Sequence, residues 1–395
     1  MNGTAPTRPE ARLLLACARV SPDREAEGQV RELAWQHLDW AWVLDTAGPH
    51  GILPLLNHHL RTIANGDVPA SVRAELGRRA EADAQRNLRL AGELLRLLDH
   101  FAERGITTVP HKGPLLAAMC YGDLALRPFR DLDFLVRPSD RTLACHVLAA
   151  AGYRPPLRRT AHQEAAFRAS TREAAFWRND DIVELHWAFA LPECPSPLRP
   201  DEVWMRLQAV HLGGRVVHTL GSEDLLLYLC AHGAKHGWAR LEWICDVAQL
   251  ARSESGLEWD AITARAYARG CERMVLLGLL LARDLLEAPV PEPLLARARA
   301  DATVRSLARL VQSRLFTDTT AEDPWNARVF QLRVLERWRD RVRFILRLTF
   351  TPSLGDWELV RLPAVLSFLY YLIRPVRLAV KFGRLPFNRA VSLQH

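Results

Sequence analysis

The hydrophobic and polar positions of this chain follow a helical period at both ends and a strand period between them. Apolar residues recur every three or four positions through residues 8–103 and again through 257–350, with Arg and Glu on the opposite faces. This spacing predicts packed amphipathic helices, and no sustained heptad pattern indicates a coiled coil. Residues 105–187 instead contain short β-branched and aromatic runs separated by Gly, Pro and Asn, which predict strands mixed with helices.

The central stretch predicts one small sheet. Its expected strands are 106–109, 132–137, 173–178 and 181–187, and its expected helices are 114–121 and 139–151. After a proline-rich boundary, the pattern predicts a helix at 201–208, a strand at 215–219 and a helix opened by Ser222. We therefore predict an α+β fold, a small mixed sheet flanked by N-terminal and C-terminal helical regions. Its expected parts are an N-terminal helical region at 1–104, the α/β core at 105–220, a helical domain at 221–350 and an apolar, basic helical tail at 351–395.

Two acidic residues begin the second expected strand. In a strand, residues two apart point to the same side, so Asp131 and Asp133 share one face while Leu132 and Phe134 share the other. Two neighbouring carboxylates repel each other unless a cation lies between them. Hard oxygen ligands in this arrangement suit Mg²⁺, which is commonly shared with substrate phosphates. The alternative is a solvated edge face, which the following Phe-Leu-Val run disfavours.

A Lys-Gly-Pro corner precedes the acid pair. Gly113 allows the backbone to approach a ligand closely, and Pro114 fits the first turn of the expected helix. Free amides at a helix start, with the cation of Lys112 beside them, can bind an anion. The chain holds only three Lys (112, 235 and 381) against 49 Arg. A Lys retained against this bias is a candidate for a compact charge on a phosphate.

An anion site next to a metal-binding Asp pair indicates nucleotide chemistry. Phosphoryl or nucleotidyl transfer with two metal ions requires a third carboxylate. Glu184 is the best candidate, because it lies in an apolar strand and shares a face with His186. Asp180 and Asp181 are the alternatives, although both fall at the expected turn. The alternative without a catalytic role is that Glu184 is a solvent-exposed side chain on the edge strand of a hairpin.

These motifs together resemble a known family. The matching residues are Lys112-Gly113, Tyr121, Arg127, Asp131-x-Asp133, Gly152-Tyr153, Glu184-Leu-His186-Trp187, His232-x-x-x-His236-x-Trp238 and Trp243-x-x-Asp246. They are similar to the bacterial uncharacterised nucleotidyltransferase family, within the polymerase-beta-like nucleotidyltransferase superfamily. The resemblance implies an α/β catalytic core, two Mg²⁺ ions and an NTP donor, expected to be ATP. It also suggests a peptide or small molecule as the acceptor.

The chain departs from the superfamily at the glycine corner. Where that superfamily has Gly-Ser or Gly-Gly, this chain has Gly113-Pro114, and residues 114–130 separate the corner from Asp131. No Ser hydroxyl is available there for the triphosphate. Lys112, Arg127 and the helix-start amides are expected to bind it instead.

A later histidine stretch adds candidate pocket residues. His232 and His236 are four apart and share a helical face with Lys235 close by. A zinc protease helix requires Glu directly after its first His, and Gly233 stands there. The functional interpretation places His232, Lys235 and His236 in the nucleotide or acceptor pocket. The bland interpretation is a helix whose histidines pack against Trp238 and Asp246.

The predicted function is Mg²⁺-dependent transfer of a nucleoside monophosphate to an acceptor hydroxyl, with release of pyrophosphate. In it, Asp131, Asp133 and Glu184 hold the metal ions. Two alternatives stay open: a catalytically idle nucleotide-binding or scaffold protein, and a kinase-like transfer of the terminal phosphate. All three functions are compatible with the same predicted α/β core.

The composition gives predictions about the location and the partners of this protein. Seven Cys without a C-x-x-C pair predict a reducing, cytoplasmic location. The net charge of +7 is dispersed and no nucleic-acid module is visible, so no nucleic-acid partner is expected. The apolar tail at 357–382, with interspersed Arg, allows weak contact with a membrane surface, although core packing or a helical lid is the simpler interpretation.

Overall fold

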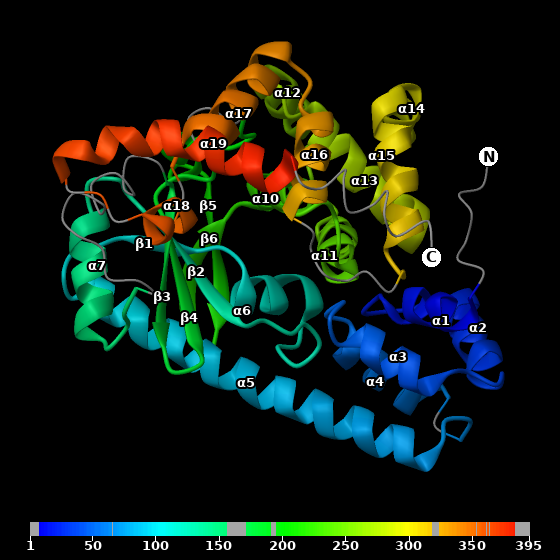
Figure 1. Ribbon diagram of the computed structural model, residues 1–395. Coiled ribbons are helices and arrows are strands. Elements are labelled where there is room, and N and C mark those ends of the chain that lie inside the picture. Colours follow the sequence, from blue (N-terminus) through cyan, green and yellow to red (C-terminus); the bar gives the residue numbers. More distant parts are fainter. Residues whose placement is uncertain are drawn as a thin grey trace.

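A computed structural model describes residues 8–64, 66–155, 171–190, 195–317, 324–352, 354–360, 362 and 364–383. Five helices open the chain: α1 (Pro9–Cys17), α2 (Arg24–Ala34), α3 (Trp40–Ala47), α4 (Leu53–Ile63) and α5 (Ala70–Ala102). Asp23 caps α2 by accepting a hydrogen bond from the Ala26 amide, and Asp39 caps α3 in the same way. The long helix α5 runs beneath the sheet (Figure 1).

The sheet has four strands: β1 (Thr108–Pro110), β2 (Asp131–Val136), β3 (Glu173–Arg178) and β4 (Asp181–His186). Their order is β1-β2-β4-β3; β2 and β4 are parallel, and the outer pairs are antiparallel. Asn179 takes a left-handed conformation in the β3–β4 turn, as Asn tolerates. The predicted α+β class with a small mixed sheet is confirmed.

The two faces of the sheet have different roles. Leu132, Phe134, Val183 and Leu185 are fully buried in a cluster that also contains apolar side chains of α5 and of α7 (Arg141–Ala150). Alternation along the strands sends Asp133, Glu184 and their neighbours to the other face, toward α10 (Ser222–Lys235). The buried apolar face fixes the register, so a one-residue slip is strongly disfavoured.

Some sequence-based boundaries were wrong. The helix expected at 114–121 is a short α6 (Gly113–Leu116) followed by a π-helical turn η1 (Ala117–Tyr121). The helix expected at 201–208 ends early: α9 covers Pro200–Val203 and the chain then enters strand β5 (Leu207–Leu212). β5 pairs with β6 (Arg215–Leu220) across Gly213 and Gly214, both with positive φ. A Gly-Gly hairpin turn favours two strands here over a helix.

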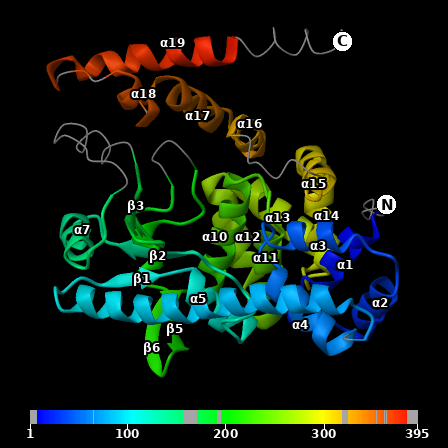
Figure 2. The same cartoon turned by 60° about the horizontal axis from the view of Figure 1, so that its bottom comes forward.

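The described residues after β6 form helices joined by short connections. Its elements are α10, α11 (Leu241–Ser253), α12 (Trp259–Arg269), α13 (Glu272–Leu286), α14 (Glu292–Ala300), α15 (Ala302–Arg314), α16 (Pro324–Val334), α17 (Trp338–Phe350), α18 (Leu354–Leu359), η2 (Ala364–Leu369) and α19 (Tyr370–Gly383). Figure 2 shows α17, α18 and α19 as an outer layer on the side of the sheet opposite α5. Among the described residues, every helix is too short or too polar to cross a membrane. The four-part domain division remains a prediction.

Candidate active site

The Lys-Gly corner lies against the acidic strand. Gly113 has φ +50°, and a Cβ at this position would approach the carbonyl oxygen of Asp131 to 3.3 Å. Only glycine meets both demands without strain. Lys112 is thereby held beside β2, with its Nζ 3.2 Å from Asp133 Oδ2. Burial opposes the charge on Lys112, but Asp133 holds the pKa of Lys112 well above its ordinary value.

Asp133 and Glu184 are register partners across the parallel pair β2–β4. Asp131 shares their face, since it precedes Asp133 by two residues. Asp133 is 2% exposed, whereas Glu184 and Asp131 are partly exposed. Burial and the neighbouring Asp133 raise the pKa of Asp131. Burial acts in the same direction on Asp133, but Lys112 and His186 hold its pKa well below the usual range. The structure thus brings together the three predicted acids and Lys112.

These residues fit a divalent cation. Oδ2 of the buried Asp133 accepts no hydrogen bond with proper geometry from any described residue, and Lys112 is the cation beside it. Three carboxylates on one face supply oxygen ligands of the kind that Mg²⁺ takes, and burial together with repulsion from Asp133 raises the pKa of one of them, Asp131.

His186 connects the acids to a further ion pair. Its Nε2 lies 3.1 Å from Asp133 Oδ1 and 3.4 Å from Glu184 Oε2, and its Nδ1 lies 3.4 Å from Glu173 Oε2. Glu173 in turn pairs with Lys235 Nζ at 3.4 Å. Burial alone lowers the pKa of His186, but the surrounding carboxylates raise it to about 9. The carboxylates of the site therefore favour the positively charged form of His186.

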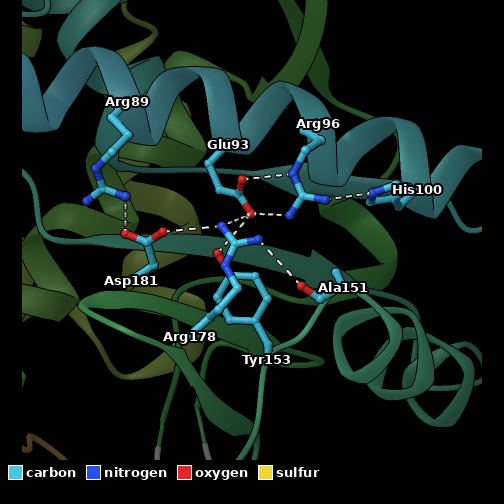
Figure 3. A network of polar contacts seen from close by, with 8 residues as sticks. All are labelled: Arg89, Glu93, Arg96, His100, Ala151, Tyr153, Arg178 and Asp181. Atoms are coloured by element: carbon cyan, nitrogen blue, oxygen red, sulfur yellow. Dashed lines mark hydrogen bonds and ion pairs between the residues drawn. The ribbon is translucent and has the colours of Figure 1, made fainter.

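The alternative third carboxylates lie elsewhere. Asp181 points to the α5 face, where it pairs with Arg89 and, at 3.3 Å, with Arg178 (Figure 3). Arg178 also binds Glu93 of α5 at 2.8 Å, so this network fastens the β3–β4 turn to α5. Asp180 is exposed in the turn itself. Glu184 is the candidate that shares the face of Asp133.

Arg127 is bound to another acid. Its Nε and one Nη donate hydrogen bonds to the two oxygens of Asp246 at 2.7 and 2.8 Å, and Tyr121 donates a third bond to Asp246 at 2.7 Å. Both Arg127 and Asp246 are buried. The trio joins the loop before β2 to α11. A phosphate contact by Arg127 stays a prediction, because this pairing already uses two of its donors.

His232, Lys235 and His236 all line the cavity that contains Lys112 and Glu184. Tyr228 stacks on His232 with ring centroids 5.9 Å apart, and His232 lies 4.7 Å from His236. Burial lowers the pKa of both histidines, that of His236 to about 4, so they are neutral near pH 7. The two neutral imidazoles, in tilted and edge-on contact with Trp243, form an aromatic surface suited to a flat base or ring.

The cavity measures about 1320 Å³ and extends to the C-terminal helices. Arg328 of α16, Arg347 of α17 and Arg374 of α19 line it, and none of the three was predicted as a site residue. Burial, together with Arg374 and Arg377, lowers the pKa of Arg328. Glu173 and His111 were missed as well. No local pattern signals such residues, because the tertiary fold alone brings them to the acids.

One family model matches this chain. The model described as "Uncharacterised nucleotidyltransferase" matches residues 36–287, which include all three acids and the histidine stretch. The chain belongs to this family. It is therefore an enzyme of the nucleotidyltransferase class, as the motif resemblance predicted. Helices α16–α19 lie outside the matched residues.

Other comparisons add little. No curated protein matches the chain. Among solved structures, antibiotic-resistance factor ANT(2'')-Ia is similar over 46% of this chain and 91% of its own, with 13% identity and a TM-score of 0.34. A likeness this loose transfers neither residues nor substrate to this nucleotidyltransferase.

Proposed function

We propose that the enzyme transfers a nucleoside monophosphate from an NTP, with ATP as the expected donor, to a hydroxyl of a peptide or small molecule. The acceptor oxygen forms a bond to the α-phosphorus, the bond between that phosphorus and the bridging oxygen breaks, and pyrophosphate leaves. The hydroxyl proton passes to solvent. The observation that supports this proposal is the pairing of Asp133 with Glu184 on one face, with Lys112 3.2 Å from Asp133.

Asp131, Asp133 and Glu184 would hold the two Mg²⁺ ions expected for this class. When bound, such ions neutralise phosphate charge and lower the pKa of an attacking hydroxyl. Lys112 would bind phosphate oxygens as a buried point charge, and Arg127 is the further predicted phosphate ligand. Gly113 has no side chain, so it would leave room for the phosphate to approach the backbone closely. His186 would fix the orientation of Asp133 and Glu184.

The remaining cavity residues would hold the rest of the substrates. His232 and His236 offer neutral aromatic rings for a base or an acceptor ring, and Lys235 adds a cation next to Glu173. Arg328 has no hydrogen bond or ion pair with any other described residue, so its charge is available to an anionic group of a substrate. A cytoplasmic location is part of the proposal, and it rests on the six described cysteines, which are free thiols. As expected from sequence, we propose no nucleic-acid partner.

The exposed apolar side chains of the C-terminal layer support a further part of this proposal, a weak contact with an anionic membrane surface. Trp338, Val342 and Ile345 form a stripe along α17, and Leu372, Val376 and Val380 form another along α19. Residues 324–395 contain 13 Lys and Arg against four Asp and Glu, so the positive net charge is concentrated here. Apolar stripes with surrounding cations suit an anionic lipid surface.

Labelled nucleotides test the reaction and separate the alternatives. The protein is incubated with Mg²⁺, α-labelled or γ-labelled NTPs and a panel of hydroxyl-bearing peptides and small molecules. Transfer of the α label with release of pyrophosphate supports the proposal. Transfer of the γ label alone indicates a kinase-like enzyme, and nucleotide binding without transfer indicates an idle scaffold.

The matched variants are Asp133→Asn and Asp131→Asn. Both should lose transfer, and circular dichroism measures whether each variant keeps the native helix content. Asp131→Asn is included because Asp133 is fully buried beside Lys112, so its replacement also affects folding. Full turnover by a folded Asp131→Asn protein would end the proposal.

A further inference from the structure

His111 is a buried histidine whose ring makes no well-formed hydrogen bond with the described residues. It is 1% exposed and lies between the end of β1 and Lys112. Neither Nδ1 nor Nε2 has a hydrogen bond of good geometry with any described residue, and the backbone of Val109 offers only a weak polar contact. A buried polar group left without a partner costs on the order of 1–3 kcal/mol, so the position calls for an explanation.

The fold places His111 beside two other ligand atoms. The strand order β1-β2-β4 brings together the end of β1, Asp133 in the middle of β2 and His186 at the end of β4. One nitrogen of each imidazole and one oxygen of Asp133 all lie within 4.8 Å of one another. The ring centroids of His111 and His186 are 5.2 Å apart, at 79° to each other.

The chemistry of this trio differs from that of the three carboxylates. Two imidazoles and one carboxylate are ligands that Zn²⁺, Co²⁺, Mn²⁺ and Fe²⁺ accept, whereas Mg²⁺ prefers oxygen alone. Asp133 can serve both sets, because Oδ1 faces His186 and Oδ2 faces Lys112. Glu173 Oε2 lies 3.4 Å from His186 Nδ1. A carboxylate at this place can accept a hydrogen bond from the ring and so orient the imidazole toward a metal ion.

We propose that His111, Asp133 and His186 form a binding site for one divalent transition-metal ion, next to the carboxylates that would hold Mg²⁺. This site deepens the proposed function, since it shares Asp133 and would make the enzyme respond to transition metals as well as to magnesium. A bound ion would give His111 a well-formed polar contact that no described residue supplies.

Packing offers a competing explanation. The rings of Phe189 and Tyr228 contact His111 edge-on, with centroids 5.8 and 4.9 Å away. A histidine used only as an aromatic core residue would fill this space without any ion. The two explanations differ in what happens when a metal is offered.

The full-length protein is stripped with a chelator and titrated with Co²⁺, whose visible absorption reports its ligands. The site predicts one Co²⁺ per chain, with d–d bands that Zn²⁺ removes on competition. His111→Asn and His186→Gln should each weaken Co²⁺ binding at least ~10-fold. Replacing a residue that only hydrogen-bonds to a metal ligand already lowers metal affinity by about that factor. His236→Asn, in the same cavity but outside the trio, should leave the spectrum unchanged.

Two results would overturn the site: wild-type protein that binds no Co²⁺ at micromolar concentration, or a folded His111→Asn protein with the wild-type spectrum and affinity. The second outcome would assign His111 to core packing. Asp131→Asn separates this site from the proposed function. That variant should lose nucleotidyl transfer but keep the Co²⁺ bands, so either inference can fail without the other.

Discussion

Lys112 and Asp133 form a buried ion pair, with Nζ 3.2 Å from Oδ2. Lys112 follows the end of β1, whereas Asp133 lies within β2, 21 positions later in the chain. The pair links the glycine corner to the acidic face of β2. It also leaves Lys112 12% exposed toward the cavity, where a phosphate can reach it. The cation is thus held by a carboxylate that we propose as a metal ligand.

Lys112→Ala should weaken NTP binding more than it slows turnover, because Lys112 is proposed to bind the phosphates before and during reaction. We expect the KM for NTP to rise about 10-fold or more, the effect of losing a charge-assisted hydrogen bond of 1.5–3 kcal/mol. Steady-state kinetics measures it. Lys112→Arg should recover little, since a planar fork does not fit a site shaped for a point charge. An unchanged KM for NTP in Lys112→Ala would remove Lys112 from the phosphate site.

Glu184→Gln and Asp181→Asn form a matched pair on the same strand. Glu184 faces Asp133, whereas Asp181 pairs with Arg89 and Arg178 on the opposite side. Glu184→Gln should reduce kcat by a factor of about 10² or more with the melting temperature preserved, since loss of one electrostatic contact to a transition state costs this much. Asp181→Asn should lower the melting temperature and retain turnover. The reverse pattern in activity and melting assays would contradict the assignment of faces.

The Arg127–Asp246 pair should stabilise the fold, in addition to any contact of Arg127 with phosphate. Asp246→Ala leaves the Arg127 charge buried alone, which costs about 3–5 kcal/mol of unfolding free energy. The double variant Arg127→Met/Asp246→Leu should recover much of that loss, because it removes both charges. Urea denaturation measures each value. Equal losses in the single and double variants would show that packing, and not the stranded charge, is responsible.

Glu242 should make stability depend on pH. Its burial raises its pKa to about 7, against an ordinary value near 4.5, even though Arg240 opposes the shift. The folded state therefore binds the proton more tightly, so the stabilisation is complete below pH 4.5 and is lost as the pH rises to 7. Glu242→Gln should be more stable than wild type at pH 8, by up to roughly 3 kcal/mol, and close to it at pH 4.5. Denaturant unfolding at both pH values measures this; a variant less stable at pH 8 would contradict the shift.

The C-terminal layer should bind anionic vesicles weakly. Wild-type protein should float with phosphatidylglycerol vesicles at low salt, should not float with phosphatidylcholine vesicles, and should be released as salt screens the cations. Leu372→Glu/Val376→Glu should abolish flotation, because Leu372 is 61% exposed in the apolar stripe of α19. Leu88→Glu is the control, at a residue of similar exposure (64%) on α5. Equal loss in both proteins, or no flotation of wild type, would favour core packing or a lid.

The secondary structure could be predicted where one local signal was strong. Helical periodicity predicted packed helices over residues 8–103, where α1 to α5 lie, and Asn179-Asp180 predicted the β3–β4 turn. One strand of the hairpin, β5, was not predicted, because the pattern at 201–208 favours a helix and the tight turn at Gly213-Gly214 pairs β5 with β6. The split at Leu116 was not predictable, since a π-helical turn has no strong sequence signal of its own.

The sequence by itself determined the chemistry on each strand. Strict alternation along β2 and β4 sent Asp131, Asp133, Glu184 and His186 to one side, because a strand repeats every two residues whatever surrounds it. Only the tertiary structure decided which strands are neighbours. The parallel pairing of β2 with β4 set Glu184 opposite Asp133, the end of β1 delivered His111 and Lys112 to them, and the C-terminal helices brought Arg328 to the same cavity. These contacts join residues tens to hundreds of positions apart, and long-range packing, which no local pattern encodes, selects them.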